Sequence, residues 1–320
     1  MKRIITIITA LSIIAIIACS NQKNKENSLS QKEASETANR ISHPNKTSNN
    51  ETSLNDEFKK YWYAGEAEIT SYELKQARYG EIRDGNAVLI YVTEDFLPDI
   101  QVKADQRKST NVPVLKLNAT KNFNTGIYPY SIMQSTFYPV KDDSHAIKIS
   151  SSLQEWCGHV YTQINNRDNY EVTSHSYFQG EADQSFALDK TILENELWTK
   201  IRINPKNLPQ GALQIIPSLE FTRLRHKPIK AYEAKASLIT EGKLQIYTIE
   251  YPELQRKLEI SFTSDFPYSI EGWKETYISG FGQSAKELTT TATKLQQIKS
   301  PYWTKNSNKD EKLREELQLK

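Results

Sequence analysis

The run Glu81-Ile82-Arg83-Asp84-Gly85-Asn86-Ala87-Val88-Leu89-Ile90-Tyr91-Val92-Thr93 decides the fold class of this chain. Asp84-Gly85 is a strong hairpin signal, because a type I′ turn needs positive φ at both central residues. Residues 61–79 before it are rich in aromatic and β-branched residues, which favour strands. Residues 87–93 after it are continuously apolar, which indicates burial on both faces. We therefore predict an antiparallel hairpin that turns at Asp84-Gly85.

Short apolar runs separated by polar turns recur through the rest of the body, which is typical of antiparallel strands. The expected strands cover residues 112–120, 128–140, 146–152, 155–164, 170–179, 212–224, 229–239, 244–251, 256–262, 268–278 and 288–298. This pattern predicts a mainly β fold, namely a large curved antiparallel sheet, an open half-barrel or a sandwich, with one or two short helices. We expect one large domain over residues 58–305, or two β halves that meet near residues 205–212.

One helix is expected to interrupt the strands near the middle of the chain. Asp189 is a candidate N-cap, and Asn204-Pro205 would end the helix because proline cannot continue the hydrogen-bond ladder. Apolar residues recur between them at helical spacing: Ile192, Leu193, Leu197, Trp198 and Ile201. A short charged helix is also expected over residues 310–319, within a terminal segment that covers residues 306–320.

The amino end has the pattern of a lipoprotein signal peptide. Lys2-Arg3 is followed by an apolar run over residues 4–18, which is shorter than the ~20 residues that a membrane span needs. Ile16-Ile17-Ala18-Cys19 reads as a lipobox, so we expect cleavage after residue 18 and lipidation of Cys19. Residues 19–57 are then the lipidated cysteine and a polar, disordered tether. The alternatives are an ordinary cleaved signal peptide or a short anchor helix.

The charge balance gives no support for a nucleic-acid partner. The chain has 41 basic and 39 acidic residues, and removal of Lys2 and Arg3 with the signal peptide would leave equal numbers of each. Nucleic-acid binding would call for a basic stripe. His43, His145 and His175 show no metal-ligand spacing, so we expect neither a metal nor a cofactor. Lipidation of Cys19 would leave Cys157 without an intramolecular disulfide partner.

The densest group of reactive side chains lies in the predicted strand over residues 155–164. Alternation places Glu155, Cys157, His159 and Tyr161 on one face of that strand. One hypothesis makes Cys157 a nucleophile whose thiolate His159 favours. The other gives this face a role in ligand contact or packing, because residues two apart on a strand are ~6.5 Å apart and would not bond without strain.

Arg223 and Arg225 form a second candidate site, for anions. On the predicted strand both side chains would point the same way and could bind a carboxylate or an anionic headgroup. The alternative is a solvated strand face that pairs with acids such as Glu220 and Glu233. The 17 Tyr, 10 Phe and 5 Trp also have two interpretations, either core packing or an aromatic-lined groove.

Four motifs resemble an uncharacterised family of lipoproteins from Bacteroidetes-type bacteria. They are Ile127-Tyr128-Pro129-Tyr130-Ser131, Glu155-Trp156-Cys157-Gly158-His159, Ile201-Arg202-Ile203-Asn204-Pro205 and Ile216-Pro217-Ser218. Relatives sometimes carry the label "septum formation inhibitor Maf", but this chain lacks the Ser-x-Ser-Pro-Arg-Arg motif of Maf-type nucleotide pyrophosphatases. The body is also loosely similar, in its strand pattern, to the open half-barrels of LolA-like lipoprotein carriers.

Together these patterns predict an envelope lipoprotein that is anchored to a membrane, the outer membrane in our interpretation, through its N-terminal lipid. The expected role is a non-enzymatic binding or carrier module for an apolar or amphipathic ligand, or for an envelope partner. One alternative is an envelope enzyme that uses Cys157 and His159. A second alternative is a purely structural, partner-binding lipoprotein.

Overall fold

The computed structural model describes residues 56–141 and 143–319. The predicted signal peptide, Cys19 and residues 19–55 of the predicted tether lie outside these residues. These described residues belong to one compact unit. The fold is mainly β, as predicted, with 55% strand and 16% helix. Within the described residues the strands of both halves of the chain join in one 16-stranded sheet.

The first half of the chain supplies one helix and nine strands. They are α1 (Asp56–Trp62), β1 (Ala67–Arg78), β2 (Glu81–Leu97), β3 (Val102–Lys103), β4 (Val112–Thr125), β5 (Tyr128–Pro139), β6 (Lys148–Glu155), β7 (Gly158–Asn166), β8 (Tyr170–Ser176) and β9 (Gln184–Leu188). The second half adds β10 (Ile192–Leu193), α2 (Glu194–Ile203), β11 (Gly211–Ile216), α3 (Leu219–Leu224), β12 (Tyr232–Glu241), β13 (Leu244–Tyr251), β14 (Arg256–Thr263), β15 (Ile270–Ser279), β16 (Lys286–Ser300) and α4 (Lys312–Glu316), with short 3₁₀ turns between them.

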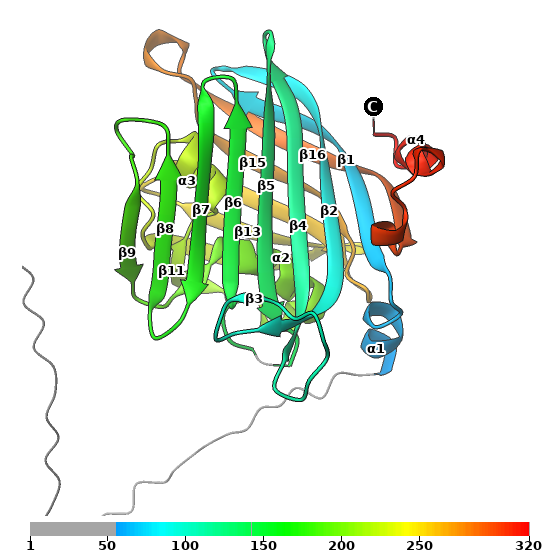
Figure 1. Cartoon of the computed structure of the whole chain (residues 1–320). Coiled ribbons are helices and arrows are strands. Elements are labelled where there is room, and N and C mark those ends of the chain that lie inside the picture. The colour runs from blue at the N-terminus through cyan, green and yellow to red at the C-terminus, as the bar shows by residue number, and fades with distance from the viewer. Residues whose placement is uncertain (1–55, 142, 320) are drawn as a thin grey trace, which may run out of the picture. The chain divides into compact units, whose positions relative to one another are not determined.

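The sheet runs in the order β10-β11-β12-β13-β14-β15-β16-β1-β2-β4-β5-β6-β7-β8-β9, and β3 pairs with β2. Its central strand β1 pairs antiparallel with both β2 and β16, so the two halves of the chain meet at β1. Among the strands that the structure describes, only β10 and β11 pair in parallel. The sheet does not close into a barrel. Figure 1 shows that it instead folds into two facing layers, β4–β9 and β11–β16, with α2 and α3 between them.

The space between the layers is filled by one large hydrophobic core. Leu197 and Ile201 of α2 and Phe221 of α3 pack there against residues of both layers, such as Leu117 and Ile260. Each buried side chain of this size contributes ~1.5–3 kcal/mol relative to an exposed one. The concave side of the sheet is therefore covered by its own crossover helices.

Helix α2 is also fixed at both ends by buried ion pairs. Its first residue, Glu194, accepts hydrogen bonds from the Arg256 guanidinium, with Arg256 Nη2 at 2.7 Å from Glu194 Oε1. Near its other end, Arg202 donates to both carboxylate oxygens of Glu68, at 2.6 and 2.7 Å. An acidic residue at the N-terminus and a basic one at the C-terminus also agree with the helix dipole. The helix predicted over residues 192–201 is thus present, but Leu193 rather than Asp189 precedes it.

The predicted hairpin is present, but its turn lies elsewhere. The chain turns at Tyr79-Gly80, where both residues have positive φ, 55° and 76°. Gly85 instead lies inside β2, opposite Phe123 of β4. A Cβ at Gly85 would lie 2.3 Å from the carbonyl oxygen of Asn122. The glycine of Asp84-Gly85 thus permits close approach of two strands, which is a second common use of glycine in sheets.

Two other local predictions were wrong, and the short helices are more numerous than expected. Residues 61–62 belong to helix α1, and β1 begins only at Ala67. The strand predicted over residues 212–224 ends at Ile216, because Pro217 has no N–H to donate and Ser218 caps helix α3 by accepting from Phe221 N at 3.2 Å. Four short α-helices are present among the described residues, where one or two were expected.

The predictions for the C-terminal part hold more closely. The strand expected over residues 288–298 lies within β16, and the short terminal helix is α4. In the described part of the chain, no helix combines the length and the apolar character needed to cross a bilayer.

Candidate functional site

The strand predicted over residues 155–164 is broken at its start by a two-residue turn. Glu155 ends β6 and Gly158 begins β7, and these two residues pair across the hairpin. Trp156 and Cys157 therefore form the tip. The four predicted site residues do not share one strand face, because only His159 and Tyr161 belong to β7.

Cys157 is exposed in a setting that disfavours its thiolate. Its backbone N–H donates to Glu155 Oε2 at 2.7 Å. A hydrogen bond between the thiol and the Glu155 carboxylate raises the pKa of Cys157, and some desolvation and the carboxylate charge add to this shift. Among the described residues no hydrogen bond joins Cys157 to His159. A thiol with a raised pKa is a poor nucleophile at neutral pH.

Arg223 and Arg225 lie at the end of helix α3, not on a strand. Arg223 is its penultimate residue, and Arg225 is its C-cap. Sequence reasoning missed a third arginine, Arg78, which is 6% exposed at the end of β1. Arg78 donates to the α3 carbonyl of Leu224 at 2.6 Å and to the hydroxyl of Tyr130 at 3.1 Å. The turn that follows it, at Tyr79-Gly80, was the one sequence signal for its position, because it places the end of β1 at the same end of the sheet as Arg223 and Arg225.

These three residues, Arg78, Arg223 and Arg225, are called here the arginine cluster. Burial lowers the pKa of both Arg223 and Arg225, and the nearby charge of Arg78 lowers them further. Arg223 pairs with Glu181 at 3.0 Å. Within the part of the chain that the structure describes, Arg78 and Arg225 make no salt bridge, and the buried Nε atoms of Arg78 and Arg223 have no hydrogen-bond partner. The cluster therefore carries cationic hydrogen-bonding capacity that its own surroundings do not use.

Large apolar side chains surround the arginine cluster on the tips of five hairpins. We call them the hairpin-tip rim: Tyr79 (37% exposed), Ile127 (81%), Trp156 (69%), Tyr177 (75%) and Phe281 (57%). These tips join β1 to β2, β4 to β5, β6 to β7, β8 to β9 and β15 to β16, and they all lie at the upper end of the sheet in Figure 1.

The arginines interleave with this rim. Arg78 stacks over the ring of Tyr79 at 4.1 Å, and Arg225 lies 6.0 Å from the ring of Phe281. The rings of Tyr79 and Phe281 are themselves 6.3 Å apart. The terminal N–H groups of Arg78 already donate within the protein, so Arg225 offers its guanidinium edge more readily to a planar acidic group. The rim and the cluster thus form one surface with apolar and cationic parts.

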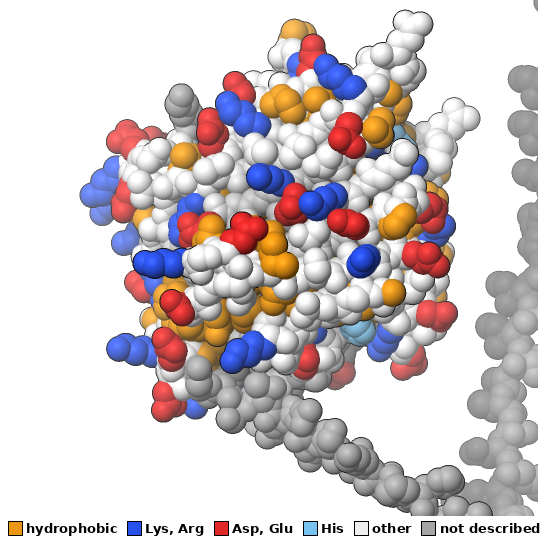
Figure 2. Space-filling view, turned by 180° about the vertical axis from the view of Figure 1, so that it is seen from behind, with side chains coloured by type: hydrophobic (Ala, Val, Ile, Leu, Met, Phe, Trp, Pro, Cys, Tyr) orange, Lys and Arg blue, Asp and Glu red, His pale blue; other side chains and the backbone are white. Residues whose placement is uncertain are grey.

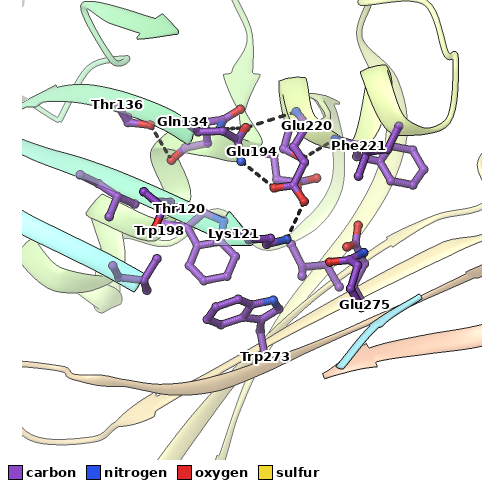
Figure 3. A pocket seen from close by; sticks show the side chains of 18 of the residues that line it. Thr120, Lys121, Gln134, Thr136, Glu194, Trp198, Glu220, Phe221, Trp273 and Glu275 are labelled. Carbon is purple, nitrogen blue, oxygen red and sulfur yellow. Dashed lines mark hydrogen bonds and ion pairs between the residues drawn. The ribbon is translucent and has the colours of Figure 1, made fainter. Parts of the chain in front are cut away.

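A small cavity of about 50 Å³, lined by both apolar and polar side chains, lies beneath the arginine cluster, between the layers. Figure 3 shows Lys121 reaching across it from β4 to Glu220 of α3, with Trp273 below. Lys121 Nζ lies 2.7 Å from Glu220 Oε1, and Gln134 Nε2 donates to the other oxygen at 3.0 Å. Burial nevertheless raises the pKa of Glu220, against the effect of Lys121. Ligand pockets usually measure ~300–1,000 Å³, so this cavity suits a few water molecules.

A larger groove of about 810 Å³ lies at the opposite end, near α1. Its carboxylates face cations: Glu94 pairs with Lys116 at 2.8 Å and Lys103 at 3.3 Å, and Asp95 lies 3.9 Å from Arg107. In the described residues no group of His, Cys, Asp and Glu side chains is arranged to hold a metal. Figure 2 shows basic and acidic side chains intermixed over the outer face of the rear layer.

Comparisons with known proteins add little to this description. No family model matches the chain, and no curated protein matches it. One solved structure, a porin-like protein from Bacteroides uniformis ATCC 8492, is 8% identical over 71% of this chain and 95% of that chain, with a TM-score of 0.21. At this score the likeness carries no argument about fold or function. The fold places this chain in the class of mainly β proteins, with an open, folded sheet around two internal helices.

Proposed function

We propose that this chain is a membrane-anchored envelope lipoprotein that binds or carries an amphipathic ligand with an acidic head group, without catalysing a reaction. One observation carries the proposal. Three arginines lie together at the hairpin-tip end, only Arg223 of them has a carboxylate partner among the described residues, and exposed aromatic rings surround them. In this proposal the arginine cluster binds the carboxylate or phosphate, and the rim contacts the apolar part of the ligand.

The energetics favour an acidic head group over a neutral one. A charge-assisted hydrogen bond contributes ~1.5–3 kcal/mol, about twice the value for a neutral pair. Burial and, to a smaller extent, the charge of Arg78 lower the pKa of Arg223 and Arg225, and an anion at the cluster would offset that repulsion. The ligand would lie on the rim and not between the layers, because the cavity there is too small for it.

The predicted lipid at Cys19 supports the envelope part of the proposal. Three acyl chains would hold the protein firmly, since each buried methylene contributes ~0.8 kcal/mol. A tether of residues 20–55 would have an r.m.s. reach of roughly 35 Å by the scaling law for flexible chains. The folded body could then search the space near the membrane, the outer membrane in our interpretation, for its ligand.

Binding of a defined probe tests the proposal. The mature chain with Cys19→Ser is titrated with a fluorescent fatty acid below its critical micelle concentration. Arg225→Ala should weaken binding at least ~10-fold, because it removes one charge-assisted contact. Lys108→Ala, in the groove at the other end, is the matched control and should leave binding unchanged. Equal affinities for the two variants would refute the arginine cluster as the binding site.

The enzyme alternative makes a separate prediction. If Cys157 acted as a nucleophile, its thiol would need a lowered pKa, whereas Glu155 raises it. A covalent adduct on Cys157, isolated with a substrate from the native envelope, would favour the enzyme over the carrier. Native extraction followed by mass spectrometry of the bound molecules would identify the ligand class directly.

A further inference from the structure

The outermost part of the hairpin-tip rim is uncharged as well as apolar. The turns Thr125-Gly126-Ile127-Tyr128 and Trp156-Cys157-Gly158 contain no ionisable side chain other than tyrosine and the cysteine thiol. The turn over residues 280–285 contains none at all. Burying these tips in an apolar or interfacial medium would therefore desolvate no full charge, which is the main cost of such a transfer.

The five tips belong to one end of the folded unit because the strand register places them there. Gly80 N donates to Ser279 Oγ at 3.1 Å, which joins the turn after β1 to the turn after β15. The rings of Tyr128 and Trp156 are 6.4 Å apart, which joins the next two tips. Tyr177 lies against Gly158, whose Cβ would come within 2.7 Å of the tyrosine ring. The exposed side chains thus form one continuous border and not scattered positions.

The cations of the arginine cluster lie deeper than the rings of the rim, whereas the acids Glu81 and Asp183 in two of the tips are exposed. Arg78 is almost fully buried, and Arg223 and Arg225 are partly buried behind the aromatic side chains that extend furthest. Aromatic rings prefer the boundary between hydrocarbon and water, and long basic side chains reach from there to phosphates. A protein partner would more often meet a packed central patch, with its anchor residues in pockets. Separate protruding tips instead suit a soft, deformable surface.

We propose that the hairpin-tip rim docks on the surface of a lipid bilayer that contains anionic lipid, with the arginine cluster at the level of the phosphates. The proposal rests on the same cluster as the proposed function. It also requires Ile127, Trp156 and Phe281 to enter the bilayer, which the binding of a soluble ligand at the rim does not. Docking would allow an amphipathic ligand to pass between the bilayer and the rim without crossing open water.

Sedimentation with vesicles tests the docking. The mature chain with Cys19→Ser is mixed with vesicles of phosphatidylcholine alone or with 30% phosphatidylglycerol. We expect binding to the anionic vesicles, weakened in 0.5 M salt because ionic screening is then short-ranged. Equal binding to both kinds of vesicle would overturn the role of the arginine cluster.

Two triple variants compare the ends of the protein. Ile127→Ser, Trp156→Ser and Phe281→Ser together should weaken vesicle binding at least ~10-fold, since they remove the inserted apolar area. Ile100→Ser, Val102→Ser and Trp303→Ser change exposed apolar residues elsewhere, which are 64%, 43% and 50% exposed, and should have no effect. Equal loss in both variants, or in neither, would overturn docking through the rim. Urea unfolding of each variant shows whether the fold is retained, and in the intact chain brominated lipid should quench a fluorescence component that Trp156→Phe removes.

The fatty-acid probe separates this inference from the proposed function. If the intact protein binds the probe but not the anionic vesicles, docking fails and the ligand site stands. If it binds the vesicles but not the monomeric probe, the ligand site fails and docking stands.

Discussion

The two ends of the folded sheet treat their charges differently. At the α1 end, Glu94 and Asp95 face Lys103, Lys116 and Arg107, so that opposite charges compensate one another along the groove. At the hairpin-tip end, Arg78 and Arg225 have no carboxylate partner among the described residues, and aromatic rings lie beside them. Compensated charges are typical of a solvated surface, whereas uncompensated cations among aromatic rings are typical of recognition. This difference in charge compensation, and not the volume of the groove or of the cavity, is why we place the candidate site at the hairpin-tip end.

Helix α2 has a buried ion pair near each of its ends. Breaking these two ion pairs is therefore the first test of the comparison between the two ends of the sheet. Arg202→Met would leave the Glu68 carboxylate buried without its cation, and we expect a loss of about 3–5 kcal/mol in the free energy of unfolding. Arg256→Met should cost more, because it would leave two acidic residues, Glu194 and Glu275, without their shared partner. Urea unfolding at pH 7 measures both.

The double variant Glu68→Leu with Arg202→Met provides the control. Replacing both members of a buried pair by apolar residues is often nearly neutral, so it should recover most of the stability that Arg202→Met loses. If Arg202→Met proves more harmful than Arg256→Met, the α1 end and not the tip end contains the more tightly constrained charges.

These buried pairs show which features of the structure the sequence could predict and which it could not. Alternation and turn residues were sufficient for the mainly β class, because they are local properties of the chain. The pairing of Glu68 with Arg202 spans 134 positions, and that of Arg78 with Leu224 spans 146. No local pattern encodes such contacts. Arg223 and Arg225 were found as a pair, but their helix and their third member depended on Pro217 and on the turn at Tyr79-Gly80.

Strand spacing beneath the rim gives the next largest effect. Gly85→Ala would place a Cβ 2.3 Å from the Asn122 carbonyl oxygen. The strands would have to move apart, and overpacking of this kind costs ~1–3 kcal/mol. Gly180→Ala, at a tip where a Cβ would meet nothing within 4 Å, is the matched control and should change stability by less than ~0.5 kcal/mol. Chemical denaturation of the two variants measures their free energies of unfolding. Equal losses would contradict the expectation that the paired strands tolerate an added Cβ less well than the hairpin tip does.

The two ends should also differ in how their stability depends on pH, because the pKa of Glu68 is lowered and that of Glu220 is raised. Burial raises the pKa of Glu68, but Arg202 and Tyr61 outweigh it, so the net pKa is lowered. Stability from Glu68 is therefore present above its unfolded pKa, ~4.3, and is lost as pH falls further. At the tip end, burial raises the pKa of Glu220. The native state then holds this proton more tightly, and its contribution to stability increases as pH falls from neutral towards ~4.3.

Glu220→Gln isolates the second effect. Between pH 7 and pH 5 the intact protein should gain more stability, or lose less, than the variant does, because only the intact protein can take up the proton at residue 220. Below pH 4 both should lose stability through Glu68. Parallel curves for the two proteins from pH 7 to pH 5 would show that Lys121 keeps Glu220 ionised and that the tip end titrates like the α1 end.

The smallest expected effect is on thiol reactivity. One disulfide reagent can compare the reaction rates of a thiol at each end of the sheet. With Cys19→Ser, Cys157 is the only cysteine of the chain. Glu155→Gln should accelerate its reaction with a disulfide reagent at pH 7.5 by about 2- to 5-fold, because the thiol no longer donates to a carboxylate and its pKa falls. Asp183→Asn, a nearby acid without that contact, should leave the rate unchanged.

A thiol introduced at the α1 end by Val102→Cys, with Cys157→Ser, lies beside Lys103 and should react faster than Cys157. If Cys157 reacts faster instead, its thiolate is favoured after all, and the rim would have to be considered a catalytic surface in place of a binding one.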